Sequence, residues 1–347
     1  MKAAARLPLP AGVGDADGEL RIQHLFRGAR RDGRIHPLQH LVQRYRQGVT
    51  AQVAAAPMPA PVPAACAPID VASLHRCVRE LPALPQAALQ ALGALRDDSA
   101  SADRCAELIG HDQALAARAL RLANSAFYGV PGRVGTLRDA VQLLGRRPLA
   151  SLLTLASVAQ QFDVRGCPSL SFAGFWRHAI ATALAAGAIA RALSGDEDQA
   201  FTVGLLHDIG RLALATHFPA QTAVALARVR ELDRGQAEAE RQLLGTDHQA
   251  VGAQVAARWS FPPEVVQALA EHHAPQPVGG GVASLADIVH LADAVAHALD
   301  LAGDPHDIVP AIEPEAWDRL ALATRRLPDI FGETEAGVAE LARLMGL

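Results

Sequence analysis

From residue 69 onward, apolar side chains recur at helical spacing, and polar or small residues mark where each repeat stops. Leu115, Ala119 and Leu122, for example, fall on one face of a helix. Ser, Thr and Asp favour helix N-termini, whereas glycine and proline interrupt the pattern. The segment 69–165 therefore predicts a first helical lobe, with helices at about 70–80, 85–96, 101–111, 112–124, 136–144 and 148–162.

The same spacing continues over residues 170–303 and predicts a second lobe. An alanine-rich helix extends from Phe175 to about Leu193, and the next helix leads to His207 and Asp208. Three more helices are predicted at 248–259, 262–271 and 285–299, and residues 304–347 form a C-terminal extension with one or two further helices.

The composition supports an all-α fold. Half of the 347 residues are hydrophobic but only 4% are aromatic, and alanine and leucine dominate. Ala, Leu, Arg and Gln favour helix, whereas the strand-forming Val, Ile, Tyr and Phe are sparse. A chain of this length can hold about two domains. The two predicted helical lobes, joined as one 69–303 domain, account for most of it.

The N-terminal part has a different composition. Residues 1 to about 20 are rich in Gly, Pro, Ala and Asp, which predicts poor order. Between Arg21 and Arg46 there are seven arginines against one aspartate, with apolar residues at helical spacing. Two short basic helices follow from this pattern, either as a solvated arginine face or as a docking segment for an acidic partner or nucleic acid. We expect a basic segment over 1–56 and, from the alternating prolines, an extended linker over 57–68.

Charge and cysteine content narrow the class of protein. The formal net charge is −4, so the chain as a whole gives no electrostatic reason for binding nucleic acid or a membrane surface. The four cysteines are scattered without CxxC pairs, as in proteins with reduced thiols. No run of 18 or more uncharged apolar residues and no signal peptide is visible. These features predict a cytoplasmic protein.

The second lobe concentrates side chains that bind metals. His207 is followed directly by Asp208 inside an apolar run that ends in glycine. Taken alone, such a pair indicates the polar end of a buried helix. Other predicted helices of the second lobe, however, carry further histidines and an aspartate that could bind the same metal ion. Imidazole and carboxylate groups suit divalent Fe, Mn or Zn. The candidate ligands of one or two ions are His178, His207, Asp208, His248, His272, His273 and Asp293.

A family resemblance rests on seven sequence blocks that follow one another in order. They are Leu81–Pro85, Ala114–Arg118, Leu122–Tyr128, Ala140–Gly145, Gly204–Gly210, Glu271–His273 and Leu291–Asp293. The blocks resemble HDOD, the HD-related output domain, over about residues 75–300. The resemblance implies a two-lobed, all-α fold in bacterial signal transduction, which acts through another signalling protein and has no established catalysis. Dimerisation is compatible with such a role.

The order His, His-Asp, Asp also resembles the HD phosphohydrolase superfamily, and His248 with His272-His273 resembles its two-metal HD-GYP branch. That resemblance implies a metal-dependent phosphohydrolase of a nucleotide or cyclic dinucleotide, with Asp208 and Arg211 as candidate catalytic residues. Two departures argue against it. Arg211 replaces the lysine of the HD-GYP pattern and is not equivalent to it. Ala274-Pro275 replaces the Gly-Tyr-Pro loop. We therefore expect a regulatory module that can bind metal, with hydrolysis as the alternative.

Overall fold

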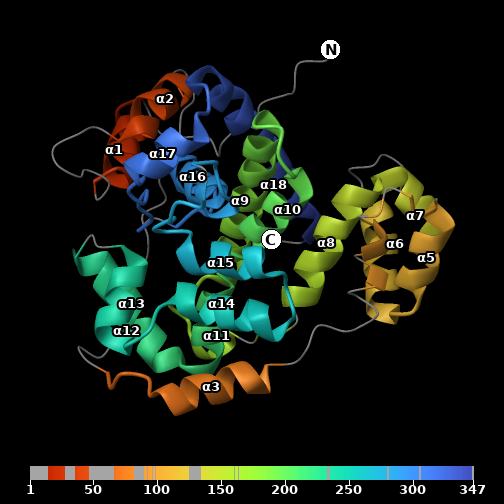
Figure 1. Cartoon of the computed structure of the whole chain (residues 1–347), viewed down its shortest axis with the longest axis horizontal. Helices are drawn as coiled ribbons and strands as arrows, with labels where there is room; N and C mark the ends of the chain where they lie inside the picture. Colours follow the sequence, from red (N-terminus) through yellow and green to blue (C-terminus); the bar gives the residue numbers. More distant parts are fainter. Residues whose placement is uncertain are drawn as a thin grey trace. The chain divides into compact units, whose positions relative to one another are not determined.

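Every regular element in the described part of the chain is a helix, which confirms the all-α prediction (Figure 1). The computed structural model describes residues 15–27, 36–46, 66–81, 90–91, 93–95, 97, 99–124, 134–159, 161–162, 164–232, 235–279, 281–304 and 306–345. The alternating prolines at 57–63 of the predicted linker, most of the predicted helix 85–96 and the end of the Leu122–Tyr128 block lie outside these residues.

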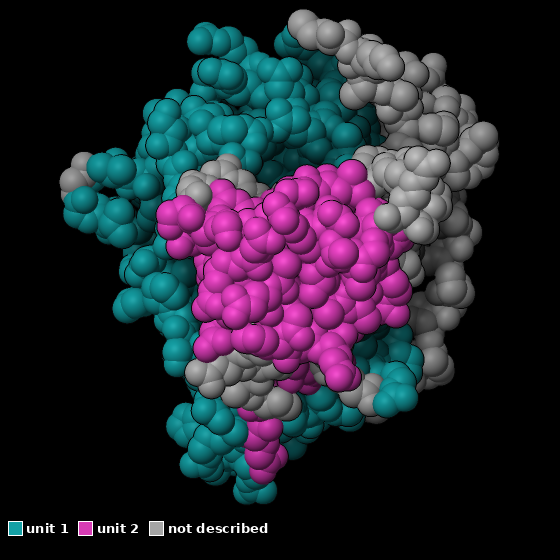
Figure 2. Space-filling view, turned by 90° about the vertical axis from the view of Figure 1, so that its right-hand side faces the viewer, with its two compact units in different colours: residues 1–79, 164–342, 347 teal, residues 80–163, 343–346 magenta. Residues whose placement is uncertain are grey.

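The chain forms two compact units, which Figure 2 distinguishes by colour. Unit 1 comprises residues 1–79, 164–342 and 347, and unit 2 comprises residues 80–163 and 343–346. Unit 1 is therefore built almost entirely from two separate stretches of sequence, and most of unit 2 lies between them in the chain. All candidate metal ligands belong to unit 1.

Unit 2 is a small bundle whose helices begin at the polar residues that the sequence marks. The helices α5 (Ala102–Gly110), α6 (Gln113–Ala123) and α7 (Leu137–Leu144) pack on one another, and α8 (Arg146–Ala159) packs on α6 and α7. The Ser101 and Thr136 hydroxyls accept the N–H groups of Arg104 and Asp139, as expected of N-caps.

Two predicted boundaries were wrong. Helix α8 begins at Arg146 and ends at Ala159, whereas the sequence placed it from Pro148 to Phe162. Gly145, with a φ of 79°, ends α7, and the next helix begins at once. Proline is tolerated anywhere in the first turn of a helix, so Pro148 does not mark the first position. Helix α1 begins at Asp15, within the stretch that the composition predicted to be poorly ordered.

The core of unit 1 is the helix α9 (Phe172–Ala192), which packs against α10 (Glu197–Leu206) and α16 (Leu285–Ala298). Alanine dominates α9, and small side chains let neighbouring helices approach closely. The caps Ser171 and Asp196 fix where α9 and α10 begin, and Ser284 with Asp287 forms a full capping box on α16. Of the seven candidate ligands, α9 carries His178 and α16 carries Asp293, and His207 follows the last residue of α10.

Further helices of unit 1, α11 to α15, are labelled in Figure 1. Helix α11 packs on α14, α14 on α15, α12 on α13, and α15 on α16. Asp247 caps α14 by accepting the Ala250 N–H at 2.8 Å. The bounds of these helices are α11 Ile209–His217, α12 Pro219–Leu232, α13 Gln236–Leu244, α14 His248–Arg258 and α15 Pro263–Glu271.

The remaining helices of unit 1 come from both ends of the described chain. They are α2 (Pro37–Arg46), α3 (Val71–Glu80), α17 (Pro314–Leu320) and α18 (Leu327–Met345), with α1 already described. Two short 3₁₀ turns, Val164–Gly166 and Thr324–Arg326, complete the set. The Ile69 N–H donates to the Leu244 carbonyl at 2.9 Å, which ties the start of α3 to the end of α13.

The N-terminal segment, α1 and α2, docks on the C-terminal end of α16. Arg21 pairs with Asp300 through Nε and Nη2, at 2.9 and 2.7 Å, and also donates to the Asp304 carbonyl. The Val309 N–H donates to the Leu25 carbonyl at 2.8 Å, and Tyr45 donates to Glu335. Two of the arginine-rich stretch's side chains, Arg21 and Arg46, are thus used inside the fold.

Among the described residues, no helix combines the length and the apolar character that crossing a bilayer requires.

Candidate metal centre

His207 and Asp208 lie where the chain turns from α10 into α11. His207 is the C-cap that follows α10, and Asp208, with φ −98°, precedes α11, so the pair is not part of one continuous helix. Glycines flank the turn because neighbouring backbones come very close. A Cβ on Gly204 would lie 2.8 Å from the Cα of Ala183 in α9, and one on Gly210 would lie 2.0 Å from the carbonyl oxygen of His248. The two glycines thereby bring the His-Asp pair against α9 and α14.

A first subsite consists of His178, His207, Asp293 and Oδ2 of Asp208. Nε2 of His178 lies 3.2 Å from Nε2 of His207 and 3.0 Å from Oδ1 of Asp293. Nε2 of His207 lies 3.6 Å from Oδ2 of Asp208 and 3.6 Å from Oδ1 of Asp293. Nitrogen and oxygen atoms from three separate helical segments therefore converge on one small volume.

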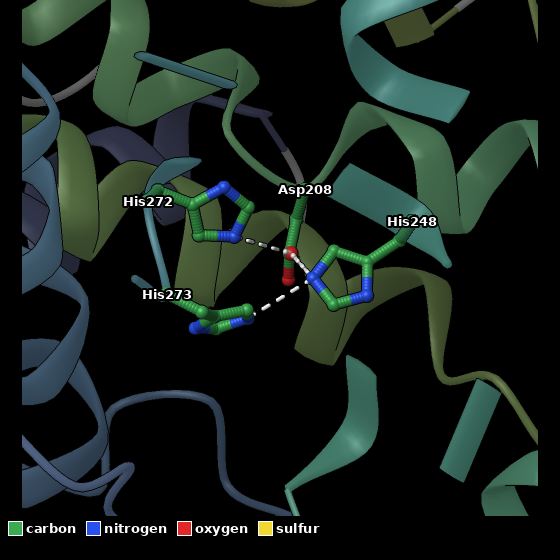
Figure 3. Close-up of side chains that lie close together, drawn as sticks. All are labelled: Asp208, His248, His272 and His273. Atoms are coloured by element: carbon green, nitrogen blue, oxygen red, sulfur yellow. Dashed lines mark hydrogen bonds and ion pairs between the residues drawn. The ribbon is translucent and has the colours of Figure 1, made fainter. Parts of the chain in front are cut away.

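A second subsite consists of Oδ1 of Asp208 with His248, His272 and His273. Figure 3 shows the three imidazoles turned toward the Asp208 carboxylate. Nε2 of His248 lies 3.3 Å from Oδ1 of Asp208, and Nε2 of His272 lies 3.8 Å from the same oxygen. The Nε2 atoms of His248 and His273 are 3.0 Å apart. Asp208 thus presents one carboxylate oxygen to each subsite.

The outward nitrogens of these imidazoles are held by the protein. Nδ1 of His207 lies 2.8 Å from the Gly204 carbonyl, and Nδ1 of His272 lies 2.8 Å from the Leu269 carbonyl. Nδ1 of His248 lies 2.6 Å from Oε2 of Glu240. An acceptor at Nδ1 fixes the proton there and leaves the lone pair on Nε2, which faces the cluster. This is the arrangement that metal-binding histidines require.

Three of the imidazoles are held neutral. Burial, together with the charges on His207 and His248, lowers the pKa of His272 to about 3. Burial also lowers the pKa of His178, and burial with the neighbouring His272 lowers that of His273 well below its usual range. A neutral imidazole has the free lone pair that a metal ion needs.

Other groups of the cluster are held charged. Burial opposes the charge on Asp208, but His207, Arg211 and His248 hold the pKa of its carboxyl well below the usual range. Burial likewise disfavours a charged His248, yet Glu240 and Asp208 raise its pKa to about 9. Without a metal ion, protons on imidazoles therefore supply positive charge beside the carboxylates. A bound cation would displace such protons.

Buried atoms that lack a hydrogen-bond partner also indicate that the cluster could hold one or two divalent cations. This observation does not depend on the charges of the residues. No described residue gives a well-directed hydrogen bond to either oxygen of Asp293 or to Nε2 of His272, although all three atoms are buried. Buried polar atoms without a partner are costly, and a cation would satisfy them. The donor atoms of Asp208, His248, His272 and His273 lie within 4.8 Å of one another, as do those of His178, His207 and Asp208. All seven predicted ligands are thus brought together.

Arg211 lies beside the cluster rather than within it. Its Nη1 donates to Oδ2 of Asp208 at 2.7 Å, one helical turn away. The planar guanidinium therefore occupies one lone pair of the shared carboxylate. In this position Arg211 orients Asp208 and holds its negative charge.

Three residues near the cluster were missed by the sequence analysis: His297, Asp307 and Glu240. Nε2 of His297 lies 3.3 Å from Oδ1 of Asp293, and its Nδ1 lies 2.6 Å from Oδ1 of Asp307. His297 follows Asp293 by four residues on α16, so helical spacing could have identified it. Glu240 and Asp307 carry no comparable signal, because turns of the chain bring them to the cluster.

A comparison with known protein families identifies the family of this chain. The model of the HDOD domain matches residues 81–275, more than half of the chain. The chain belongs to the HDOD family. The match confirms the resemblance that the sequence blocks indicated.

Relatives of this HDOD protein include chains of known structure. A protein from Shewanella amazonensis SB2B, provisionally named a phosphohydrolase, is 27% identical with a TM-score of 0.55 over 78% of this chain and 98% of its own. An HDOD domain protein of unknown function from Geobacter sulfurreducens is 24% identical, TM-score 0.61, over 78% and 99%. A protein from Marinobacter aquaeolei VT8, provisionally named a signal transduction protein, is 23% identical, TM-score 0.65, over 80% and 65%. The last two show the shared fold alone.

A curated relative from Treponema pallidum (strain Nichols) bears only the name "Uncharacterized protein". It is 26% identical over 207 residues, which make up 58% of this chain and 39% of the relative. The match therefore spans less than half of that protein.

Proposed function

We propose that this HDOD protein is a regulatory module of signal transduction that binds another signalling protein, and that the metal centre controls the module without turning over a substrate. The burial of the centre carries this proposal. The side chains of His207 and His272 are 0% exposed and Asp293 is 1% exposed, whereas His273 is 26% exposed. Catalytic metal ions need open positions for water and substrate. A centre closed on most sides suits a metal ion that stabilises the folded state or whose occupancy changes the arrangement of the helices.

The segment after His273 supports the same role. In place of a Gly-Tyr-Pro loop the chain has Ala274-Pro275. The Pro275 carbonyl accepts Nη2 of Arg319 at 3.0 Å, and the same guanidinium pairs with Asp287 at the start of α16. This segment makes a structural contact at the position where the HD-GYP branch has its substrate loop.

Metal binding would stabilise unit 1 as a whole. The candidate ligands come from α9, α14, α16, the α10–α11 turn and the end of α15. A cation that binds only the folded arrangement adds about 2.7 kcal/mol to the free energy of unfolding at a concentration 100 times its dissociation constant. The orientation of these helices, and with it the surface offered to a partner, would then depend on metal occupancy.

Metal analysis of the natively purified full-length protein tests the first half of the proposal. We expect Fe, Mn or Zn at one to two equivalents in the wild type, and a marked loss in Asp208→Asn, which removes the charge shared by both subsites. Asp318→Asn, an exposed carboxylate on α17, is the matched control and should retain the metal. Wild-type protein without bound metal, before and after reloading, would overturn the proposal.

Partner binding tests the second half. The wild type and Asp208→Asn are compared as baits for signalling proteins from native lysate, with metal present and after chelation. We expect a partner whose recovery changes with metal occupancy in the wild type but not in Asp208→Asn. Equal recovery in all four conditions would show that the metal does not control binding.

A metal-dependent phosphohydrolase is the second candidate, and the two oxygens of Asp208 favour it. Each oxygen faces one subsite, as in centres where a carboxylate bridges two ions. A bound pair of divalent ions supplies Lewis-acid activation for attack on phosphorus. The 27% identical Shewanella relative, provisionally named a phosphohydrolase, is in line with this candidate. Arg211 would hold the Asp208 charge, and the partly exposed His273 marks the side where a nucleotide or cyclic dinucleotide could enter.

Phosphate or nucleotide release separates the two candidates. Full-length protein purified anaerobically and reloaded with Fe or Mn is tested on mononucleotides and cyclic dinucleotides. A rate in the wild type that is at least 100 times that of Asp208→Ala supports hydrolysis. Equal background rates in both proteins exclude it and leave the regulatory proposal in place.

A further inference from the structure

His297 extends the first subsite on its α16 side. It lies one helical turn after Asp293, and its Nε2 is 3.3 Å from Oδ1 of that residue. Its ring centroid is 4.3 Å from that of His178. The donor atoms of His178, Asp293 and His297 lie within 4.8 Å of one another, so His178 is common to this group and to the group formed with His207 and Asp208.

Asp307 holds the other side of the same imidazole. Its Oδ1 lies 2.6 Å from Nδ1 of His297 and also accepts the Ile308 N–H at 3.0 Å. The Asp307 N–H in turn donates to the Asp304 carbonyl, which also accepts Arg21. This carboxylate is therefore itself fixed, and it directs Nε2 of His297 toward the cluster. Glu240 has the same relationship to His248 in the second subsite.

From this geometry we infer that His297 is a further ligand of the first subsite and that Asp307 is its positioning residue. The inference rests on the proposed metal centre. With His297, the first subsite offers five protein donors: His178, His207, His297, Asp293 and Oδ2 of Asp208. Structural zinc is almost always four-coordinate. Five donors of mixed nitrogen and oxygen type therefore favour Fe or Mn over zinc in this subsite. The second subsite, with four donors, does not share this preference.

A different arrangement of His297 would use the same contacts without a metal ion. His297 could donate from both nitrogens, from Nδ1 to Asp307 and from Nε2 to Asp293, and so connect the two carboxylates without ever binding a metal. In that case His297 would be a support for Asp293, and the first subsite would have four donors.

Manganese titration of the full-length protein distinguishes the two arrangements. The variants are His297→Gln and Asp307→Asn, with His217→Gln at the end of α11 as the matched control. Binding is followed by electron paramagnetic resonance, and coupled nitrogens are counted by pulsed measurements on protein labelled with ¹⁵N-histidine. Circular dichroism verifies that each variant is folded.

We expect His297→Gln to weaken one of the two manganese sites more than 10-fold and to lower its histidine nitrogen count from three to two. Asp307→Asn should weaken the same site by about 10-fold to 100-fold while the count stays at three. If His297→Gln does not fold, a 10-fold weakening in folded Asp307→Asn supports the inference, and unchanged affinity overturns it. A nitrogen count of two in the wild type, or unchanged binding in His297→Gln, also overturns it while the metal centre stands. Wild-type protein that binds no manganese overturns the metal centre itself.

Discussion

Glu240 and His248 are joined twice across the turn between α13 and α14. One oxygen of the Glu240 carboxylate lies 2.6 Å from Nδ1 of His248 and accepts the backbone N–H of the same residue at 2.8 Å. Both side chains are buried, with exposed fractions of 2% and 1%. Glu240 therefore determines which nitrogen of His248 faces Asp208 and how the first residue of α14 is placed.

Replacing Glu240 by Gln should weaken metal binding at the second subsite by about 10-fold to 100-fold, because an orienting carboxylate beside a metal-binding histidine has effects of that size. Isothermal titration with Mn²⁺ or Zn²⁺ measures the change. Glu238→Gln, an exposed position on the same helix, is the control and should bind like the wild type. Identical affinities in both variants would remove Glu240 from the metal centre.

Gly210→Ala should be strongly destabilising. Its Cβ would lie 2.0 Å from the His248 carbonyl oxygen and 2.7 Å from the Gly252 nitrogen, both backbone atoms that cannot move aside cheaply. Overpacking of this kind lowers the free energy of unfolding by about 3 kcal/mol. Gly252→Ala on the facing helix is the control, since its nearest contact would be 3.4 Å. Urea unfolding gives both free energies. Equal losses in the two variants would contradict the close approach of α11 and α14.

His36 should make the protein sensitive to mild acid. Its Nδ1 accepts the Leu38 N–H, so the proton is on Nε2, which donates to the Pro310 carbonyl at 3.2 Å. Burial lowers the pKa of His36 to about 4, below its value of about 6.5 in an unfolded chain. The unfolded state therefore binds more protons between these values, and stability present above pH 6.5 is lost as the pH falls toward 4.

The size of this loss can be measured by difference. Between pH 7 and pH 5 the wild type should lose about 2 kcal/mol of unfolding free energy through His36. His36→Gln cannot titrate there, so the stability difference between wild type and variant should shrink by that amount. A difference that stays constant with pH would mean that His36 titrates alike in the folded and unfolded states, so that its burial does not lower its pKa.

Arg21→Gln should destabilise unit 1 by about 2 kcal/mol, because it leaves the partly buried Asp300 without its bidentate partner. Arg191 is the comparison: it is 49% exposed and pairs with Glu197 at the surface. Its replacement by Gln should cost less than about 1 kcal/mol. Chemical unfolding of both variants gives the comparison. If Arg21→Gln is as mild as Arg191→Gln, the N-terminal segment contributes little to the fold.

Local sequence patterns predicted most helices of the described residues, for identifiable reasons. Four N-cap side chains each accept a hydrogen bond from the backbone N–H three residues later, so these caps depend only on nearby residues. They are Ser101, Thr136, Asp196 and Asp247. The seven candidate ligands were singled out because histidine and aspartate are rare on apolar helices and because the HDOD and HD patterns give their order. The structure brings these side chains together, and metal binding by them stays a prediction. The same helical spacing would have added His297.

Contacts between distant parts of the chain could not be predicted. Arg21 and Asp300 are 279 residues apart. No local pattern indicates that an arginine of this stretch forms an ion pair inside the fold. Asp307 and Glu240 reach the cluster through turns whose paths depend on the packing of whole helices. Pro148 misled the prediction because a proline's presence shows only that a helix is near its start.

The division of unit 1 into two stretches of sequence affects how the protein is made. Synthesis delivers α1, α2 and α3 before residues 80–163 of unit 2, and the helices that carry the candidate ligands come only afterwards. Residues 80–163 can fold on the ribosome as soon as they emerge, since domains fold as units during synthesis. The N-terminal segment must wait for α16 and residues 300–310, about 250 codons later. A metal ion would therefore bind only after α16 has been made and has packed against α9.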